Sequence, residues 1–206
     1  MAVPSLPSAF ATGTLHADGR RERGRSNRSR IVAAMLDLVG GGAVSPSAAQ
    51  VAEAAGVGLR TVFRHFSDMD ALYREMTEAI EARVLPILLR SPAGDNWQAR
   101  IRDLAERRAA IFETIMPYRI SASVRRFESP YLMQDYRRML RLEAETVEAH
   151  LPDAVRADIA AARGINVILS FATWRLLRHD QGLPVDEARA VVQRMLADAI
   201  SGLPER

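Results

Sequence analysis

The 206-residue sequence contains neither cysteine nor lysine. The absence of cysteine excludes disulfides, thiolate nucleophiles and cysteine-ligated metal sites, and it fits a protein of the reducing cytoplasm. The four histidines, at positions 16, 65, 150 and 179, are too far apart to form a local metal motif. Because all 28 basic residues are arginines, phosphate or carboxylate groups must be bound through guanidinium groups. We therefore expect no bound metal and no cofactor.

A long apolar run is also missing. The longest candidate, Gly164 to Trp174, is flanked by Arg163 and Arg175 and is too short to span a bilayer. Residues 1–19 lack the basic start and the continuous apolar stretch of a secretory signal. Hydrophobic residues make up 48% and charged residues 26% of the sequence, a composition typical of globular proteins. We expect a soluble, cytoplasmic protein that does not contact membranes.

The net charge of +3 is unevenly distributed along the chain. Residues 1–66 carry eight arginines and four acidic residues, whereas residues 67–206 carry 20 arginines and 21 acidic residues. A basic N-terminal third joined to a near-neutral remainder is typical of a polyanion-binding module attached to a second domain. A basic tail that only aids solubility is the alternative interpretation.

Apolar residues recur at helical spacing along most of the chain, and no alternating run of strand length occurs. Ile31 and Met35 mark a first helix that should end at glycines 40–42. Ser47 with Gln50 three residues later predicts a capping box at the start of the second helix. We expect an all-α fold of about nine helices, over residues 28–40, 47–55, 58–65, 67–85, 118–127, 131–150, 153–179 and 186–200, with a further helix that carries an apolar face from Ile101 to Ile115 and stops before Pro117.

Three parts of the chain follow from this pattern. Residues 1–25 are rich in Pro, Ser, Ala, Gly and Arg without periodicity, which predicts a flexible, arginine-rich arm. Residues 26–72 hold the first helices, and residues 73–206 form a larger helical domain. Pro86 and Pro117 are expected to end the helices that precede them, because proline lacks the backbone N–H that a helix interior needs.

Residues 47–66 have the spacing of a helix-turn-helix motif. Ala52 is small enough to allow a close helix crossing, and Gly56 suits the left-handed turn between two helices. Three valines, Val51, Val57 and Val62, are placed to fill the corner. In this motif the second helix enters the major groove of DNA. Short helix pairs with a glycine turn also occur in other helical proteins, but here the motif coincides with the basic third of the chain.

The surrounding residues identify a family. The segments Ala54-Ala55-Gly56-Val57, Thr61-Val62-Phe63-Arg64-His65-Phe66 and Ser67-Asp68-Met69-Asp70-Ala71-Leu72 closely resemble the DNA-binding domain of the tetracycline-repressor (TetR) family. The resemblance covers about residues 26–80. It implies an all-α transcriptional regulator without enzymatic activity, usually a repressor. The regulator would bind a palindromic double-stranded DNA operator and a small-molecule effector, and it would form a homodimer through its last two long helices.

Three positions depart from the family pattern. Gly58 replaces the usual hydroxyl residue at the start of the recognition helix, which weakens that N-cap. Phe63 replaces a tyrosine, and Met69 stands where many members have lysine. Two phosphate contacts of the family are thus missing. Arginines ahead of the first helix, Arg23, Arg25, Arg28 and Arg30, are expected to compensate by following phosphates or entering the minor groove.

The recognition helix contributes most of the expected DNA contacts. Arg60 and Arg64 can bind guanine or a phosphate, Thr61 can contact a phosphate or a thymine methyl, and Leu59 can make apolar base contacts. Phe63 could equally belong to the rim of the core or touch DNA.

Two further residues have expected contacts near this helix. Ser47 can hold a phosphate at a helix N-terminus. His65 can donate a hydrogen bond to a phosphate or to the next helix.

In the C-terminal domain the candidates for effector contacts are large or polar residues on apolar helix faces, although ordinary core packing is the default interpretation for each of them. The ligand-binding candidates are Phe112, Met116, Tyr118, Met133, Tyr136, Asn166 and Phe171. Trp174 and Leu177 are expected at the dimer interface rather than in the pocket.

Two other functions are alternatives to a transcriptional regulator. An all-α enzyme is disfavoured, because no paired carboxylates, histidine cluster, phosphate loop or nucleophile motif occurs in the sequence. A nucleoid-associated protein that binds DNA without sequence preference would share the basic charge but not a preference for one operator.

Overall fold

A computed structural model describes residues 13–91 and 93–204, with side chains from residue 24 onward. Over these ranges the protein is all-helical, which confirms the predicted fold class. No described helix combines the length and hydropathy needed to cross a membrane. The helices are α1 (Gly13–Gly40), α2 (Ala48–Ala54), α3 (Leu59–His65), α4 (Met69–Leu88), α5 (Trp97–Arg125), α6 (Pro130–Glu148), α7 (Asp153–Ala157), α8 (Ile159–Ile168), α9 (Phe171–Arg175), the π-helical turn η1 (Leu176–Asp180) and α10 (Val185–Ile200).

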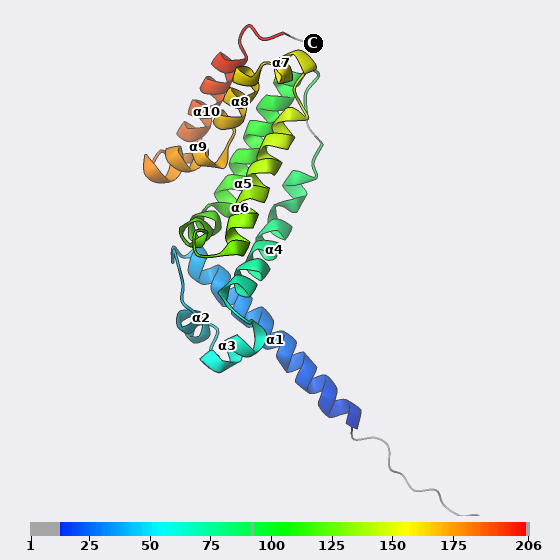
Figure 1. Ribbon diagram of the computed structural model, residues 1–206, viewed down its shortest axis with the longest axis vertical. Helices are drawn as coiled ribbons and strands as arrows, with labels where there is room; N and C mark the ends of the chain where they lie inside the picture. The colour runs from blue at the N-terminus through cyan, green and yellow to red at the C-terminus, as the bar shows by residue number, and fades with distance from the viewer. Residues whose placement is uncertain (1–12, 92, 205–206) are drawn as a thin grey trace, which may run out of the picture.

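The molecule has two parts, a head formed by α1, α2 and α3 and a body formed by α5 to α10 (Figure 1). α4 connects them, since it packs against α1 in the head and against α5 and α6 in the body. α4, α5 and α6 run along the length of the body, and α8, α9 and α10 lie on the side away from α4 (Figure 1). The domain boundary expected after residue 72 therefore falls inside α4, which belongs to both parts.

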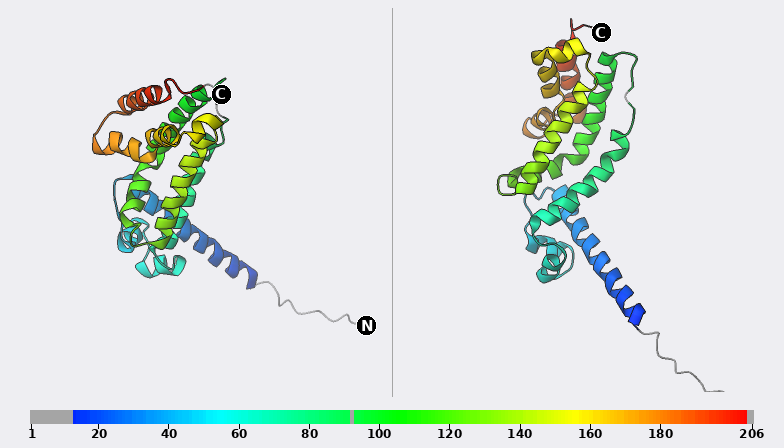
Figure 2. Two further views of the ribbon diagram at one scale, coloured as in Figure 1. Left: turned by 45° about the horizontal axis from the view of Figure 1, so that its top comes forward. Right: turned by 45° about the vertical axis from the view of Figure 1, so that its right-hand side comes forward.

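α1 is longer than the sequence pattern predicts. Residues 13–25, expected as part of a flexible arm, are helical and continuous with the rest of α1. Residues 1–12 of the expected arm lie outside the described residues. No proline interrupts α1, and its alanine, leucine, arginine and glutamate residues favour helix, which allows the helix to extend. Figure 2 shows the N-terminal part of α1 projecting away from α2, α3 and the body.

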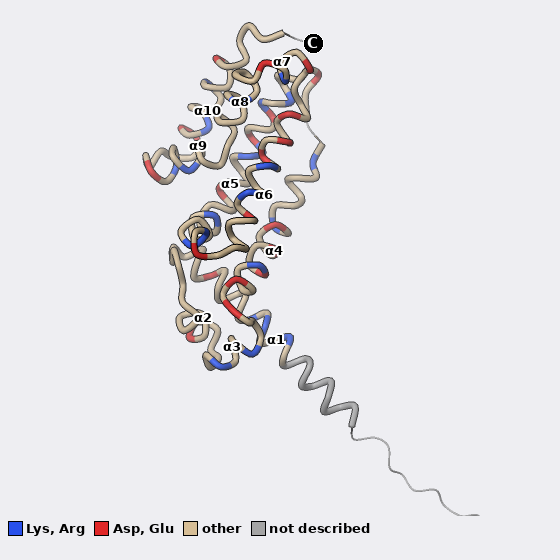
Figure 3. The backbone as a smooth tube through the Cα atoms, in the orientation of Figure 1, with Lys and Arg blue, Asp and Glu red and all other residues tan. Residues whose placement is uncertain are grey.

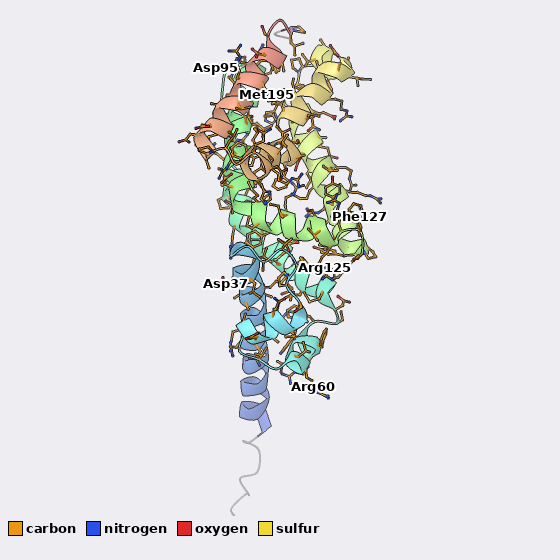
Figure 4. The ribbon with its side chains drawn as sticks, turned by 90° about the vertical axis from the view of Figure 1, so that its left-hand side faces the viewer. Asp37, Arg60, Asp95, Arg125, Phe127 and Met195 are labelled. Carbon is orange, nitrogen blue, oxygen red and sulfur yellow. The ribbon has the colours of Figure 1, made fainter. Side chains whose placement is uncertain are left out.

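The two prolines do not end their helices. α4 continues past Pro86 to Leu88, and α5 continues past Pro117 to Arg125, so the separate helix expected at 118–127 is the second half of α5. Proline inside a helix removes one hydrogen bond and costs about 3 kcal/mol. Buried residues on both sides of Pro117, among them Ile115 and Ser121, show that tertiary packing offsets this cost. α5 bends along its length as a result (Figure 4).

The single long helix expected over residues 153–179 is divided into α7, α8, α9 and η1. Side chains that cap new helices cause the breaks. Asp158 accepts hydrogen bonds from the backbone N–H groups of Ala160 and Ala161 and starts α8. Ser170 accepts from Thr173 N and starts α9. Of the two long helices expected at the C-terminus, only α10 has the predicted form.

Polar contacts, of which one is fully buried, join the head to the body. Tyr73 of α4 and Ser121 of α5 share a buried hydrogen bond of 3.1 Å between their hydroxyls. The Ser129 hydroxyl, which also caps α6, donates to Asp70 Oδ2 at 2.7 Å. The guanidinium of Arg125 lies 5.8 Å from the Tyr73 ring centroid and donates to Ser45 in the head. Because a buried hydrogen bond restrains relative geometry, the Tyr73–Ser121 contact helps to position α4 against α5.

Candidate DNA-binding face and ligand cavity

The α2–α3 pair has the packing of a helix-turn-helix. Gly56 adopts φ +62°, the left-handed conformation that the turn requires. Val57 N donates to Ala52 O at 3.0 Å and closes the turn. Val51, Ala52 and Val62 are buried where the helices meet, as predicted. Ser47 forms the predicted capping box, with Gln50 N donating to its hydroxyl at 3.3 Å and Ser47 N donating to Gln50 Oε1 at 2.9 Å.

α3 presents one face outward. Arg60 and Arg64 are exposed. Neither forms an ion pair with another described residue, because the ion pairs of the described residues involve other arginines. Leu59 is 45% and Phe63 50% exposed, so Phe63 belongs to this face and not to the core. Thr61 is half-buried beside them, whereas Val62 and Phe66 are buried as expected. In Figure 4 Arg60 lies on the side of the α2–α3 pair that is away from the body, and Figure 3 shows basic residues along α3.

Two of the arginines ahead of the helix pair bind the protein itself. Arg28 donates to Glu75 Oε1 at 2.6 Å and to His65 O at 2.7 Å, and its guanidinium lies 4.5 Å from the Phe66 ring centroid. Arg28 thus joins α1 to the end of α3 and to α4. Arg30 donates to Ala55 O at 2.6 Å and caps the last turn of α2. Arg25 is exposed, while the side chain of Arg23 lies outside the described ones.

His65 closes α3 in a cationic setting. Its Nε2 is buried and has no hydrogen-bond partner among the described residues. Burial lowers the pKa of His65, and the nearby charges of Arg64 and Arg28 lower it further. The lowered pKa favours the neutral imidazole at pH 7.

A cavity of about 600 Å³ lies in the body between α4, α5 and α6. Three of the seven predicted ligand contacts, Phe112, Tyr118 and Tyr136, line it. Met116, Met133, Asn166 and Phe171 do not. Asn166 and Phe171 belong to α8 and α9, on the side of the body away from α4. Phe171 packs edge-on against Phe112, with ring centroids 5.5 Å apart.

A buried ionic network forms the deep wall of the cavity. Arg119 pairs with Glu143 Oε1 at 2.5 Å, and Glu143 Oε2 accepts from Phe171 N at 3.2 Å. Arg108 donates to Glu143 O at 2.5 Å and to Leu169 O at 2.9 Å. Burial lowers the pKa of Arg108 to about 10, which Glu143 partly counteracts, so its guanidinium remains charged at pH 7. The network joins α5 to α6, α8 and α9.

A second ionic contact joins α4 to α6 across the cavity. Arg138 of α6 pairs with Asp135 at 2.6 Å and with Glu81 of α4. All three residues line the cavity. α4 is thereby tied both to the head and to the wall of the cavity.

The fold, but not the sequence, is similar to that of known proteins. No protein-family model and no curated protein matches the sequence. Among solved structures, a transcriptional regulator from Rhodococcus sp. Rha1 is similar at a TM-score of 0.63 and 18% identity, over 85% of this chain and 96% of that one. The multidrug binding protein EbrR, solved with imidazole, is similar at a TM-score of 0.55 and 20% identity, over 82% and 89%. This chain shares their fold.

Most charged residues of the cavity were not predicted from the sequence. The predicted ligand contacts included none of Glu81, Arg108 and Arg138, all of which line the cavity. A charged residue at an apolar helix position, such as Arg108, is the signal that could have indicated a buried network. The Glu81–Arg138 pair has no such signal, because the two residues are distant in sequence and meet only through packing.

Trp174 and Leu177, expected at a dimer interface, are buried inside the chain. Trp174 Nε1 donates to Glu113 Oε1 at 2.8 Å, which fixes the indole against α5. The prediction that these two residues lie at a dimer interface is wrong. The helix breaks before α9, and the change of direction places both side chains against the rest of the body.

Proposed function

We propose that the chain is a transcriptional repressor of the tetracycline-repressor type, a homodimer that binds a palindromic DNA operator and releases it when a small molecule occupies the body. The observation that carries this proposal is the outer face of α3, where Arg60 and Arg64 are exposed on a helix-turn-helix. The fold shared with two regulators supports the same function.

The exposed face of α3 suits the major groove. Arg60 and Arg64 can each donate two parallel hydrogen bonds to guanine O6 and N7 or to a phosphate. Leu59 and Phe63 supply apolar contacts to thymine methyls and sugars, and Thr61 supplies a hydroxyl. Arg25 adds charge on α1 beside this face.

Other predicted DNA contacts have a supporting role in this proposal. Arg28 holds the end of α3 against α4, so it positions the helix more than it contacts phosphate. Ser47 remains exposed at the start of α2, where it can approach a phosphate while its hydroxyl caps the helix. His65, whose lowered pKa favours the neutral imidazole, supports the turn between α3 and α4.

The dimer interface we propose is formed by α8 and α10, which pack side by side. α8 exposes Ile159 at 74% and Val167 at 60%, and α10 exposes Met195 at 39%. Apolar side chains on neighbouring helices are suited to a two-fold interface. In the dimer the two α3 helices would enter successive major grooves, about 34–36 Å apart.

The cavity is the proposed effector site. α4 forms one wall, crosses into the head and packs against α1, so a ligand that displaces α4 changes the position of α3. Such a ligand acts only through its different affinity for the two positions of α4. The small-molecule complex of the structural neighbour EbrR supports a ligand site in this fold.

Selection of bound DNA from a random pool tests the proposal. The wild-type protein should enrich a two-fold symmetric sequence with half-sites about one helical turn apart. The double variant Arg60→Gln, Arg64→Gln should enrich none. The variant Arg102→Gln, which removes an exposed arginine of α5 in the body, is the matched control and should enrich the wild-type sequence.

Two results would overturn the proposal. Equal affinity for all sequences at physiological salt would indicate a nucleoid-associated protein instead. Substrate turnover that persists in the double variant would indicate an enzyme.

A further inference from the structure

The shape of the cavity suits an elongated apolar molecule. Along α6 its lining extends from Leu132 to Thr146, a distance of about 21 Å at the helical rise. α4 contributes a row of aliphatic side chains, of which Leu85 is 47% and Leu88 55% exposed. Apolar side chains that remain this exposed beside a cavity gain from being covered by an apolar ligand.

The carboxylates of the cavity wall are paired with arginines or exposed to solvent. Among the carboxylates, Glu143 is paired with Arg119, and Glu81 and Asp135 are paired with Arg138. Glu78 also contributes to the lining, but it is exposed on α4, so solvent screens its charge. The acidic groups of the wall thus have little capacity for a cationic ligand.

Arg126, at the C-terminal end of α5, differs from the other cavity arginines. No carboxylate in the described part of the chain pairs with it, and its one hydrogen bond goes to Ser123 O at 3.0 Å, within its own helix. Its guanidinium lies 4.6 Å from the ring centroid of Tyr136 and 4.5 Å from that of Phe127. Phe127 is labelled at this end of α5 in Figure 4.

This stacking leaves Arg126 ready to bind an anion. Contacts with two aromatic rings fix the guanidinium without using most of its N–H donors. Five donors are available in arginine, and one is occupied here. A carboxylate can therefore accept two parallel hydrogen bonds from Arg126, and little side-chain entropy is lost in forming them.

We propose that the effector is an amphipathic monoanion, a carboxylate on an elongated apolar body, and that Arg126 binds the carboxylate while the aliphatic side chains of α4 and the α5–α6 walls cover the apolar body. This inference rests on the proposed function in assigning the cavity to the effector. Arg126 directly follows Arg125, which contacts Tyr73 and Ser45, so the anion would bind next to the head–body junction.

Calorimetric titration of the full-length protein, without DNA, tests the inference with three probes that share one alkyl chain: decanoate, 1-decanol and decylammonium. All are used below the concentration at which they form micelles. Decanoate should bind at least about tenfold tighter than 1-decanol, which is the range expected for a charge-assisted hydrogen-bonded pair. Decylammonium should bind more weakly than either.

Variants then locate the anion site. Arg126→Gln should lower the affinity for decanoate about tenfold and leave that for 1-decanol unchanged. Arg137→Gln, which removes an exposed α6 arginine outside the cavity lining, should change neither. The inference is overturned if wild-type protein binds decanoate no tighter than 1-decanol, if decylammonium binds best, or if Arg126→Gln leaves the preference intact.

The head-group comparison uses wild-type protein, so it stands even if Arg126→Gln does not fold. DNA selection is a separate measurement. An enriched operator together with no preference for decanoate would refute the anionic effector alone, whereas no enriched operator would refute the proposed function.

Discussion

Arginines serve opposite purposes in two regions of this protein. On the outer face of α3, Arg60 and Arg64 extend into solvent. Inside the body, Arg108 and Arg119 of α5 are bound by carbonyl and carboxylate oxygens of α6 and its neighbours. Figure 3 shows this contrast, with basic residues at the end of the head and mixed charges along α5 and α6.

In a sequence without lysine, arginine supplies both the exposed charges of α3 and the buried charges of the body. A guanidinium can satisfy its donors with backbone carbonyls and keep its charge in a buried site, which an ammonium does less readily. The buried arginines therefore join helices, and the exposed ones remain free for an external anion. Substitutions should separate the two groups, with losses of stability in the body and losses of DNA binding on α3.

The largest expected effect on stability is that of Arg108→Met. It leaves the Leu169 and Glu143 carbonyls without their donor and removes a charge that partly balances Glu143. We expect a loss of about 3 kcal/mol in the free energy of unfolding, as for other broken buried polar networks. Urea denaturation followed by circular dichroism measures it.

Arg102→Met is the control for this substitution, because Arg102 is an exposed residue of the same helix. It should change the unfolding free energy by less than about 0.5 kcal/mol. Equal losses in the two variants would contradict the structural role assigned to Arg108.

Arg28→Gln concerns an arginine that is intermediate between the buried arginines of the body and the exposed arginines of α3. Arg28 is partly exposed, so we expect a loss of only about 1 kcal/mol in stability from the contacts with Glu75 and His65 O. DNA binding should weaken as well, because α3 loses its link to α1 and α4. If Arg28 positions α3, Glu75→Gln should reproduce much of the loss of stability and of DNA binding. If Arg28 instead contacts a phosphate, only Arg28→Gln should weaken DNA binding.

Ser47→Ala should have a smaller effect. It removes the capping box of α2 and should lower stability by about 1 kcal/mol or less, since this N-cap is exposed. Ser91→Ala, in the exposed loop between α4 and α5, is the control and should be neutral. Thermal unfolding of the two variants side by side would show whether the capping box contributes.

The smallest effect concerns His65. Its pKa is lower in the folded protein than the unfolded value of about 6.5, so the unfolded chain binds more protons just below that pH. Stability should therefore fall as the pH drops below about 6.5, and His65→Gln should lose this part of the pH dependence. If the free energy of unfolding depends on pH in the same way for wild type and His65→Gln between pH 7.5 and 5.5, folding does not change the pKa of His65.

The head could be predicted closely from the sequence because its determinants are local. The capping box of Ser47 and the left-handed turn at Gly56 act within a few residues, and both are present as predicted. Pro117 shows the opposite case. Its local preference predicts a helix end, but the packing of residues far away in the sequence keeps α5 continuous.

The cavity was predictable only in part for the same reason. Aromatic residues on α5 and α6, such as Phe112 and Tyr136, could be singled out because they stand on apolar faces. Whether such a residue faces the cavity or the opposite side depends on where α8 and α9 pack, and the caps at Asp158 and Ser170 changed that arrangement. Pairs such as Glu81 and Arg138 depend entirely on tertiary structure.

We propose that the exposed arginines of α3, Arg60 and Arg64, give the protein its DNA specificity. The most direct test is the ratio of affinities for the selected operator and for random DNA, measured by fluorescence anisotropy at physiological salt for wild type and for Arg60→Gln, Arg64→Gln. We predict a ratio of about 10³ or more for the wild type. In the double variant, the unfolding free energy should be unchanged and the ratio should fall at least about tenfold. A ratio near one in the wild type, or an unchanged ratio in a folded double variant, would contradict the claim.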